Sequence, residues 1–80
     1  MDITIAIRNR TLQLCEKHKI SPDKLAILSR ISHSTMKNVL YGASKKPQIL
    51  TIKMLCDGLG ITLGEFFSTP EFDNLEQEIR

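Results

Sequence analysis

The sequence predicts an all-α protein: a compact body of five short helices around one core, followed by a short C-terminal helix. Three observations support this fold class. Apolar residues recur at spacings of three and four, which places them on one face of a helix. Capping residues, prolines and glycines mark helix ends at short intervals. No stretch of useful length alternates between polar and apolar residues, as a half-buried strand would.

The first helix is expected from Ile3 to about Lys19. Asp2 or Thr4 would cap its start with a side-chain oxygen. Its inner stripe follows the helical spacing and consists of Ile3, Ile7, Thr11, Leu14 and Cys15.

The run Ser21-Pro22-Asp23 marks the start of a second helix. The serine oxygen can cap the first amides, proline fits the first position because no amide donor is needed there, and the acid favours the positive helix end. Leu25, Ala26 and either Leu28 or Ser29 give this helix its inner face.

A tight turn over residues 30–32 leads into a third helix, with Ser32 as its N-cap and Tyr41 as its last residue. Gly42 follows as a C-terminal stop. Its inner residues would be Met36, Val39 and Leu40. Two short helices joined by such a turn have the form of a helix-turn-helix motif.

The fourth helix should begin at Leu50 or Thr51 and end before Gly60. Thr62 would cap a fifth helix. Two adjacent aromatic residues of that helix, Phe66 and Phe67, would close the core. We expect residues 1–69 to form one domain and residues 70–80 to form an acidic C-terminal helix or tail.

Chain length favours a binding module over an enzyme. A domain of 80 residues buries only about 60% of the surface that its unfolded chain exposes. One core fills such a domain and leaves little room for a deep catalytic pocket. The sequence also offers no nucleophile–base pair and no glycine-rich phosphate loop. We therefore expect no catalysis and no cofactor.

The cysteines and the apolar pattern indicate a cytoplasmic protein. No apolar run is long enough to span a membrane, and no signal-peptide pattern begins the chain. Cys15 and Cys56 lie far apart in predicted helices, so buried free thiols are the favoured interpretation. A partial metal site made by these cysteines and His18 is the alternative, but structural zinc needs four close ligands. We expect no metal.

Charge divides unevenly along the chain. Residues 1–69 hold ten basic side chains against five acidic ones, whereas residues 70–80 hold four acidic side chains against one basic. A basic body favours a polyanionic partner, and the acidic tail should lie away from the binding surface.

The outer side of the third helix carries polar groups suited to reading DNA. We name as the reading face the residues His33, Ser34, Lys37 and Asn38. Asparagine can pair with adenine through two hydrogen bonds, lysine donates to guanine acceptors, and serine or histidine can serve several bases. The predicted partner is therefore double-stranded DNA, with residues 33–41 in the major groove. For His33, a chance surface position is the weaker interpretation.

Phosphate contacts would hold the reading face in place. The candidates are Lys45 and Lys46 in the loop after the third helix, Thr35 beside the reading face, and Ser21 with the amides at the start of the second helix. The lysine pair has a plain alternative, because solvated surface lysines are common.

These residues resemble the lambda-repressor-like helix-turn-helix domains, the Cro/C-type or XRE-type regulators of phages and bacteria. The resemblance covers about residues 3–67. It rests on these elements in register: Ile20-Ser21, Leu25-Ala26, Ile31-Ser32-His33-Ser34-Thr35-Met36, Val39, Gly42, Pro47, Leu55 and Leu59-Gly60-Ile61-Thr62-Leu63. It implies five packed helices, a homodimer on a palindromic operator, and repression or activation of transcription. The family's base-reading positions fall on the reading face, and its loop phosphate contacts on Lys45 and Lys46.

The sequence departs from that family pattern in three places. Pro22 stands where a glutamine commonly binds phosphate and braces the reading helix, and Asp23 beside it is mildly repulsive to phosphate. Arg30 stands where a turn glycine is common, which costs roughly 1 kcal/mol if the backbone there is left-handed. Cys15 and Leu40 stand where many members hold a buried arginine–glutamate pair, and replacing both charges together can be neutral or stabilising.

The C-terminal tail leaves alternatives open. It is either an independent disordered end or a helix whose Phe72, Leu75 and Ile79 cover Ile5 and Leu12, which lie off the inner stripe of the first helix. Dimerisation through the same patch would cover Ile5 and Leu12 equally well. The second functional hypothesis is a protein-interaction module on the same fold, such as the antitoxin of a toxin–antitoxin pair, or a regulator that contacts a protein through its tail. An apolar reading face would favour that hypothesis, whereas this one is polar with lysine.

Overall fold

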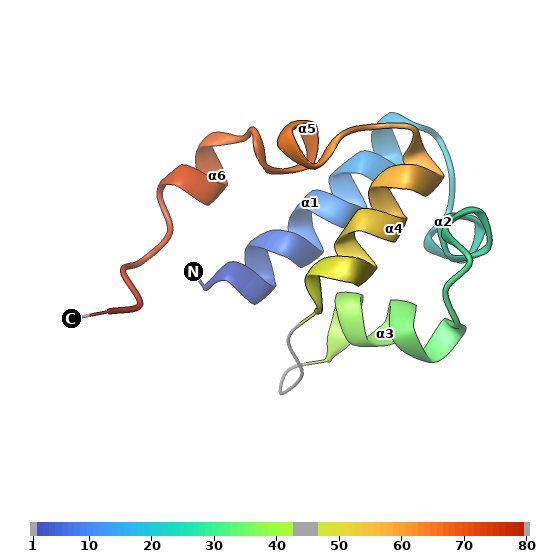
Figure 1. The fold of residues 1–80 in the computed structure, drawn as a ribbon, viewed down its shortest axis with the longest axis horizontal. Helices are drawn as coiled ribbons and strands as arrows, with labels where there is room; N and C mark the ends of the chain where they lie inside the picture. The colour runs from blue at the N-terminus through green and yellow to red at the C-terminus, as the bar shows by residue number, and fades with distance from the viewer. Residues whose placement is uncertain (1, 43–46, 80) are drawn as a thin grey trace.

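The computed structural model describes residues 2–42 and 47–79, and it is all-helical over these ranges (Figure 1). The predicted all-α class is confirmed. The helices are α1 (Ile3–Lys17), α2 (Pro22–Ser29), α3 (His33–Tyr41), α4 (Ile49–Leu59), α5 (Leu63–Phe67) and α6 (Pro70–Asp73). α2 packs mainly against α4, and α3 packs against both α1 and α2. α5 follows α4 and leads to α6, which lies beside α1 (Figure 1).

Side-chain oxygens cap the starts of several helices, as the sequence predicts. In each case the oxygen accepts a hydrogen bond from the backbone amide three residues further on, and the capping residues are Asp2, Ser21, Ser32 and Thr62. The Glu65 side chain also accepts from the Thr62 amide, which completes a capping box. Of the two candidate caps for α1, Asp2 is therefore the one used.

The helices end for different physical reasons. α1 ends at Lys17, two residues earlier than predicted, because Lys19 adopts a left-handed conformation with φ 56°. Gly60 ends α4 in the left-handed conformation that glycine favours, with φ 73°. Gly42 ends α3 with φ −78°, and a Cβ atom there would lie 2.7 Å from the Asn38 carbonyl oxygen. Position 42 therefore requires glycine because a side chain would clash there, and not because the backbone has a positive φ.

One core joins the first five helices. Its buried members are Ile7, Leu14, Cys15, Leu25, Ala26, Met36, Val39, Leu40, Ile52, Leu55, Cys56 and Phe66. The prediction for α1 was wrong at one end, because Ile3 is 41% exposed and Ala6 is buried in its place. On α2 the structure decides between two alternatives, since Ser29 is buried and Leu28 is exposed.

The last helix attaches to an aromatic cluster at the edge of the core. The Phe72 ring centroid lies 4.9 Å from that of Phe67 and 6.2 Å from that of Phe66. The Asn9 amide also donates to a carboxylate oxygen of Glu71 at 3.2 Å. α6 therefore packs beside α1.

The longer amphipathic helix proposed for the tail does not form within the described residues. α6 ends at Asp73, and Ile79 is 80% exposed. Ile5 and Leu12 remain 37% and 38% exposed, so the tail leaves them partly open to solvent. Only Phe72 of the three predicted apolar residues contacts the core cluster.

Candidate nucleic-acid interface

A tight turn with one strained residue joins α2 to α3. Arg30 adopts the left-handed conformation, with φ 56° and ψ 41°. The next amide, of Ile31, donates to the Ala26 carbonyl oxygen at 3.1 Å and closes the end of α2. The turn thus keeps the geometry that glycine would give it, and Arg30 bears a backbone cost of about 1 kcal/mol.

α3 separates apolar from polar side chains across its axis. Met36, Val39 and Leu40 are each 3% exposed and face the core. All four residues of the reading face are exposed. The structure therefore brings His33, Ser34, Lys37 and Asn38 to the solvent side of one helix, where they can meet a groove.

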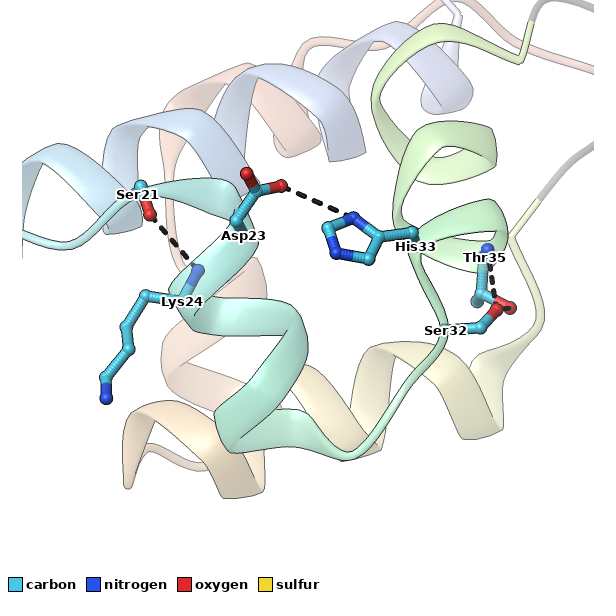
Figure 2. Close-up of polar contacts among 6 residues, drawn as sticks. All are labelled: Ser21, Asp23, Lys24, Ser32, His33 and Thr35. Atoms are coloured by element: carbon cyan, nitrogen blue, oxygen red, sulfur yellow. Dashed lines mark hydrogen bonds and ion pairs between the residues drawn. The ribbon is translucent and has the colours of Figure 1, made fainter.

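An acidic side chain of α2 faces the first residue of α3. The Nδ1 atom of His33 lies 3.5 Å from the Oδ1 atom of Asp23, with side chains 70% and 77% exposed (Figure 2). The sequence-based interpretation gave Asp23 a favourable effect on the start of α2 and a repulsive effect on phosphate, and it missed this pair. No periodicity could reveal it, because the two residues lie on different helices and meet only through the turn.

A shallow hollow of about 260 Å³ lies beside this pair. Its lining includes Pro22, Asp23, His33 and Lys37, so it separates the start of α2 from the reading helix. The hollow occupies the position where the resemblance leads one to expect a bracing glutamine. The contact between Asp23 and His33 is the polar link across this gap.

Of the four residues predicted to contact phosphate, the structure describes Ser21 and Thr35. The Ser21 hydroxyl oxygen accepts from the Lys24 amide at 3.1 Å, and the Thr35 hydroxyl oxygen accepts from the Ser32 hydroxyl at 2.9 Å (Figure 2). Both hydroxyl oxygens act as acceptors in these bonds, which leaves their hydrogens for an external acceptor. Lys45 and Lys46 lie outside the described residues.

Some of the basic charge counted in the sequence serves the fold instead. Arg10 donates from Nε to the Phe66 carbonyl oxygen and from Nη2 to the Glu65 carbonyl oxygen, each at 2.7 Å. Lys53 pairs with Asp57 one turn further along α4. Net charge therefore overstates how many cations are available to a polyanion.

The two cysteines are buried free thiols, as predicted. Burial raises the pKa of both, and for Cys56 nearby charges on Lys53 and Asp57 add smaller opposing effects. Within residues 2–42 and 47–79 no three histidine, cysteine or acidic side chains gather as a metal site would require. In the same ranges no helix has the length and apolar character needed to cross a membrane.

Cys15 and Leu40, which stand in place of a charged pair in the family pattern, are both 3% exposed. They belong to the same apolar core cluster. The joint replacement therefore leaves no uncompensated charge at these positions.

Comparison with known proteins agrees with this geometry. A family model described as the Cro/C1-type HTH DNA-binding domain matches residues 12–71. The crystal structure of the prophage Lp1 protein 11 is similar, with a TM-score of 0.83 and 26% sequence identity, over 94% of this chain and 100% of that one. Comparison with curated proteins gives no significant match.

Proposed function

The chain belongs to the Cro/C1-type helix-turn-helix family of DNA-binding domains, and on this premise we propose that it is a sequence-specific transcriptional regulator. In this proposal α3 enters the major groove of double-stranded DNA. The observation that carries it is the exposed, polar reading face on a helix whose opposite side is buried in the core. These four side chains take no part in core packing, so they are free to offer hydrogen-bonding groups to base edges.

Each residue of the reading face has a chemically distinct role. Asn38 pairs with adenine, Lys37 donates to guanine, and Ser34 adapts to several bases. His33, at the first position of α3, contacts a base near the start of the helix. Ser21, Thr35, Lys45 and Lys46 contact phosphates and fix the position of α3 without reading sequence.

The regulator is proposed to act in the cytoplasm as a homodimer on a palindromic operator. A two-fold dimer presents two copies of α3 to successive major grooves, about 34 Å apart along the duplex. Dimerisation also doubles the phosphate contacts, which a small domain needs for tight binding.

A protein-interaction module on the same fold, such as an antitoxin, is the second candidate. Exposed apolar side chains favour it: Ile27, Ile49 and Leu50 are 67%, 66% and 63% exposed. These residues lie outside the reading face, so a protein contact there is compatible with DNA binding by α3. A contact through the C-terminal tail is compatible for the same reason.

Selection of bound fragments from genomic DNA by the purified protein tests the proposal. Asn38→Ala should relax the preference at one base position and cost about 1–3 kcal/mol on the preferred site. Lys45→Ala should instead weaken binding to all sequences alike. Lys17→Ala is a matched control, because this exposed lysine lies in the last turn of α1, while α3 packs near the start of that helix (Figure 1).

Three outcomes can be distinguished. A motif that loses one position in Asn38→Ala and survives Lys17→Ala supports the proposal. Equal losses in all variants would indicate binding by charge alone. If the parent protein retains no DNA, the interaction module replaces the regulator as the proposed function.

A further inference from the structure

The imidazole of His33 faces a carboxylate on another helix. His33 begins α3 and Asp23 is the second residue of α2, and the 3.5 Å separation joins Nδ1 to the carboxylate. Figure 2 shows the ring between the two helices, with Nδ1 directed at Asp23 and the other ring nitrogen on the opposite edge. Both side chains are largely exposed, so the imidazole is accessible to a ligand.

A carboxylate can only accept hydrogen bonds. It therefore favours the tautomer of neutral histidine that carries its hydrogen on Nδ1, and this leaves Nε2 as an acceptor. We propose that Asp23 is a positioning residue that makes His33 present Nε2 to DNA as a hydrogen-bond acceptor. This inference rests on the proposed function, and it names a residue that sets the specificity of the reading face.

The tautomer decides which bases His33 can read. In the major groove the amino groups of cytosine and adenine are donors, whereas guanine O6 and N7 and thymine O4 are acceptors. An acceptor at Nε2 matches cytosine or adenine and is mismatched with guanine and thymine oxygens. His33 therefore selects a base with an amino group at the position that it contacts.

The negative charge that lets Asp23 orient His33 also weakens phosphate binding. An acid at the start of α2 repels the DNA backbone, although it also favours the positive end of that helix. Lys37 is one turn beyond His33 on α3 and lines the same hollow. Its ammonium group partly offsets the repulsion between Asp23 and phosphate. A purely structural role of Asp23 at the helix end is the competing explanation.

The first test measures the tautomer in the free protein. Long-range proton–nitrogen NMR at pH 8, where an ordinary imidazole is neutral, identifies which ring nitrogen bears the hydrogen. We expect the Nδ1-protonated form for His33 in the parent protein and a shift toward the Nε2-protonated form in Asp23→Ala. His18, exposed at the end of α1, is the internal reference and should not change. The same tautomer in both proteins would overturn the proposal.

The second test reads base preference. The DNA position at which His33→Ala relaxes selection is identified first, again at pH 8. Asp23→Ala should lose about five-fold of the preference for cytosine or adenine at that position, the value expected for one neutral hydrogen bond. In the double variant Asp23→Ala should change nothing further there. A uniform rise in affinity for all sequences, with the preference intact, would mean that Asp23 acts only by repulsion and would overturn the proposal.

The two tests separate this inference from the proposed function. If the parent protein binds no DNA, the regulator proposal fails and the base-reading role falls with it, while the NMR result still reports whether Asp23 sets the tautomer. If DNA is bound selectively but the tautomer does not depend on Asp23, only this inference fails.

Discussion

A Cβ atom placed on Gly58 would clash with the Oγ atom of Ser29 and would lie 3.0 Å from the Ser29 backbone nitrogen. Gly58 belongs to α4 and Ser29 ends α2, so the two helices approach each other closely here without an intervening side chain. Ser29 is only 5% exposed, and its hydroxyl has no hydrogen-bond partner within the described part of the chain. The close approach thus comes with an unsatisfied polar atom.

Gly58→Ala should lower the free energy of unfolding by about 1–3 kcal/mol because the added methyl group forces the helices apart. This loss exceeds the gain of about 1 kcal/mol that alanine brings to a helix interior. Ser29→Ala should be neutral or stabilising, since it removes an unsatisfied hydroxyl. Urea denaturation of the single and double variants measures both effects. A Gly58→Ala protein as stable as the parent would show that α2 and α4 can move apart freely.

The double variant provides the control. Its loss should be smaller than that of Gly58→Ala alone, because the closest atom in the clash is the Ser29 hydroxyl. Strictly additive changes would place the clash at the Ser29 backbone instead.

Arg30→Gly should raise the free energy of unfolding by about 1 kcal/mol, because glycine adopts the left-handed turn without strain. Lys19 has the same φ of 56°, so Lys19→Gly is the matched comparison and should give a gain of similar size. Thermal unfolding followed by circular dichroism provides the measurement. A loss of stability in Arg30→Gly alone would indicate that the arginine side chain contributes to the turn.

Arg10→Ala should cost about 1.5–3 kcal/mol, the range for hydrogen bonds that involve a charged group. The guanidinium joins α1 to the carbonyl oxygens of Glu65 and Phe66 at the end of α5. Arg10→Lys should recover only part of the lost stability, because an ammonium group lacks the planar array of donors with which the guanidinium reaches both carbonyl oxygens. Hydrogen exchange should show faster exchange in α5 and α6 than in α2. Equal acceleration across all helices would point to global destabilisation only.

Burial of Cys15 and Cys56 raises the pKa of both thiols, so the native protein should resist alkylation at pH 8 and react after denaturation. The sign of the pH effect follows. The unfolded thiols ionise at lower pH than the native ones, so the free energy of unfolding should fall as pH rises past about 8.5. Urea titrations between pH 7.5 and 9.5 measure the slope. In the Cys15→Ala/Cys56→Ala variant the free energy of unfolding should depend less steeply on pH. An unchanged pH dependence would assign the effect to other titrating groups.

Salt should weaken operator binding with a slope of log affinity against log salt of roughly −3 per subunit, if Lys37, Lys45 and Lys46 each neutralise one phosphate. Replacing any one of them with alanine should reduce the slope by about 1. Fluorescence anisotropy over a range of salt concentrations gives these values. A slope near zero would contradict a phosphate-based interface.

The boundaries of the first five helices could be predicted from the sequence to within about two residues, because those signals are local, whereas the last helix is shorter than its apolar spacing indicated. A cap such as Ser32 and a stop such as Gly60 act on amides and carbonyls within one turn of themselves. The apolar spacing of α3 likewise fixed which of its sides would be exposed. The reading face could therefore be named from the sequence.

The contacts between helices could be known only from the folded arrangement. It set the pairing of Asp23 with His33, the diversion of Arg10 to the end of α5, and the contact of Gly58 with Ser29. None of these pairs is adjacent in sequence or related by a helical period. They arise because packing fixes the distance and angle between helices, and those depend on all buried side chains at once.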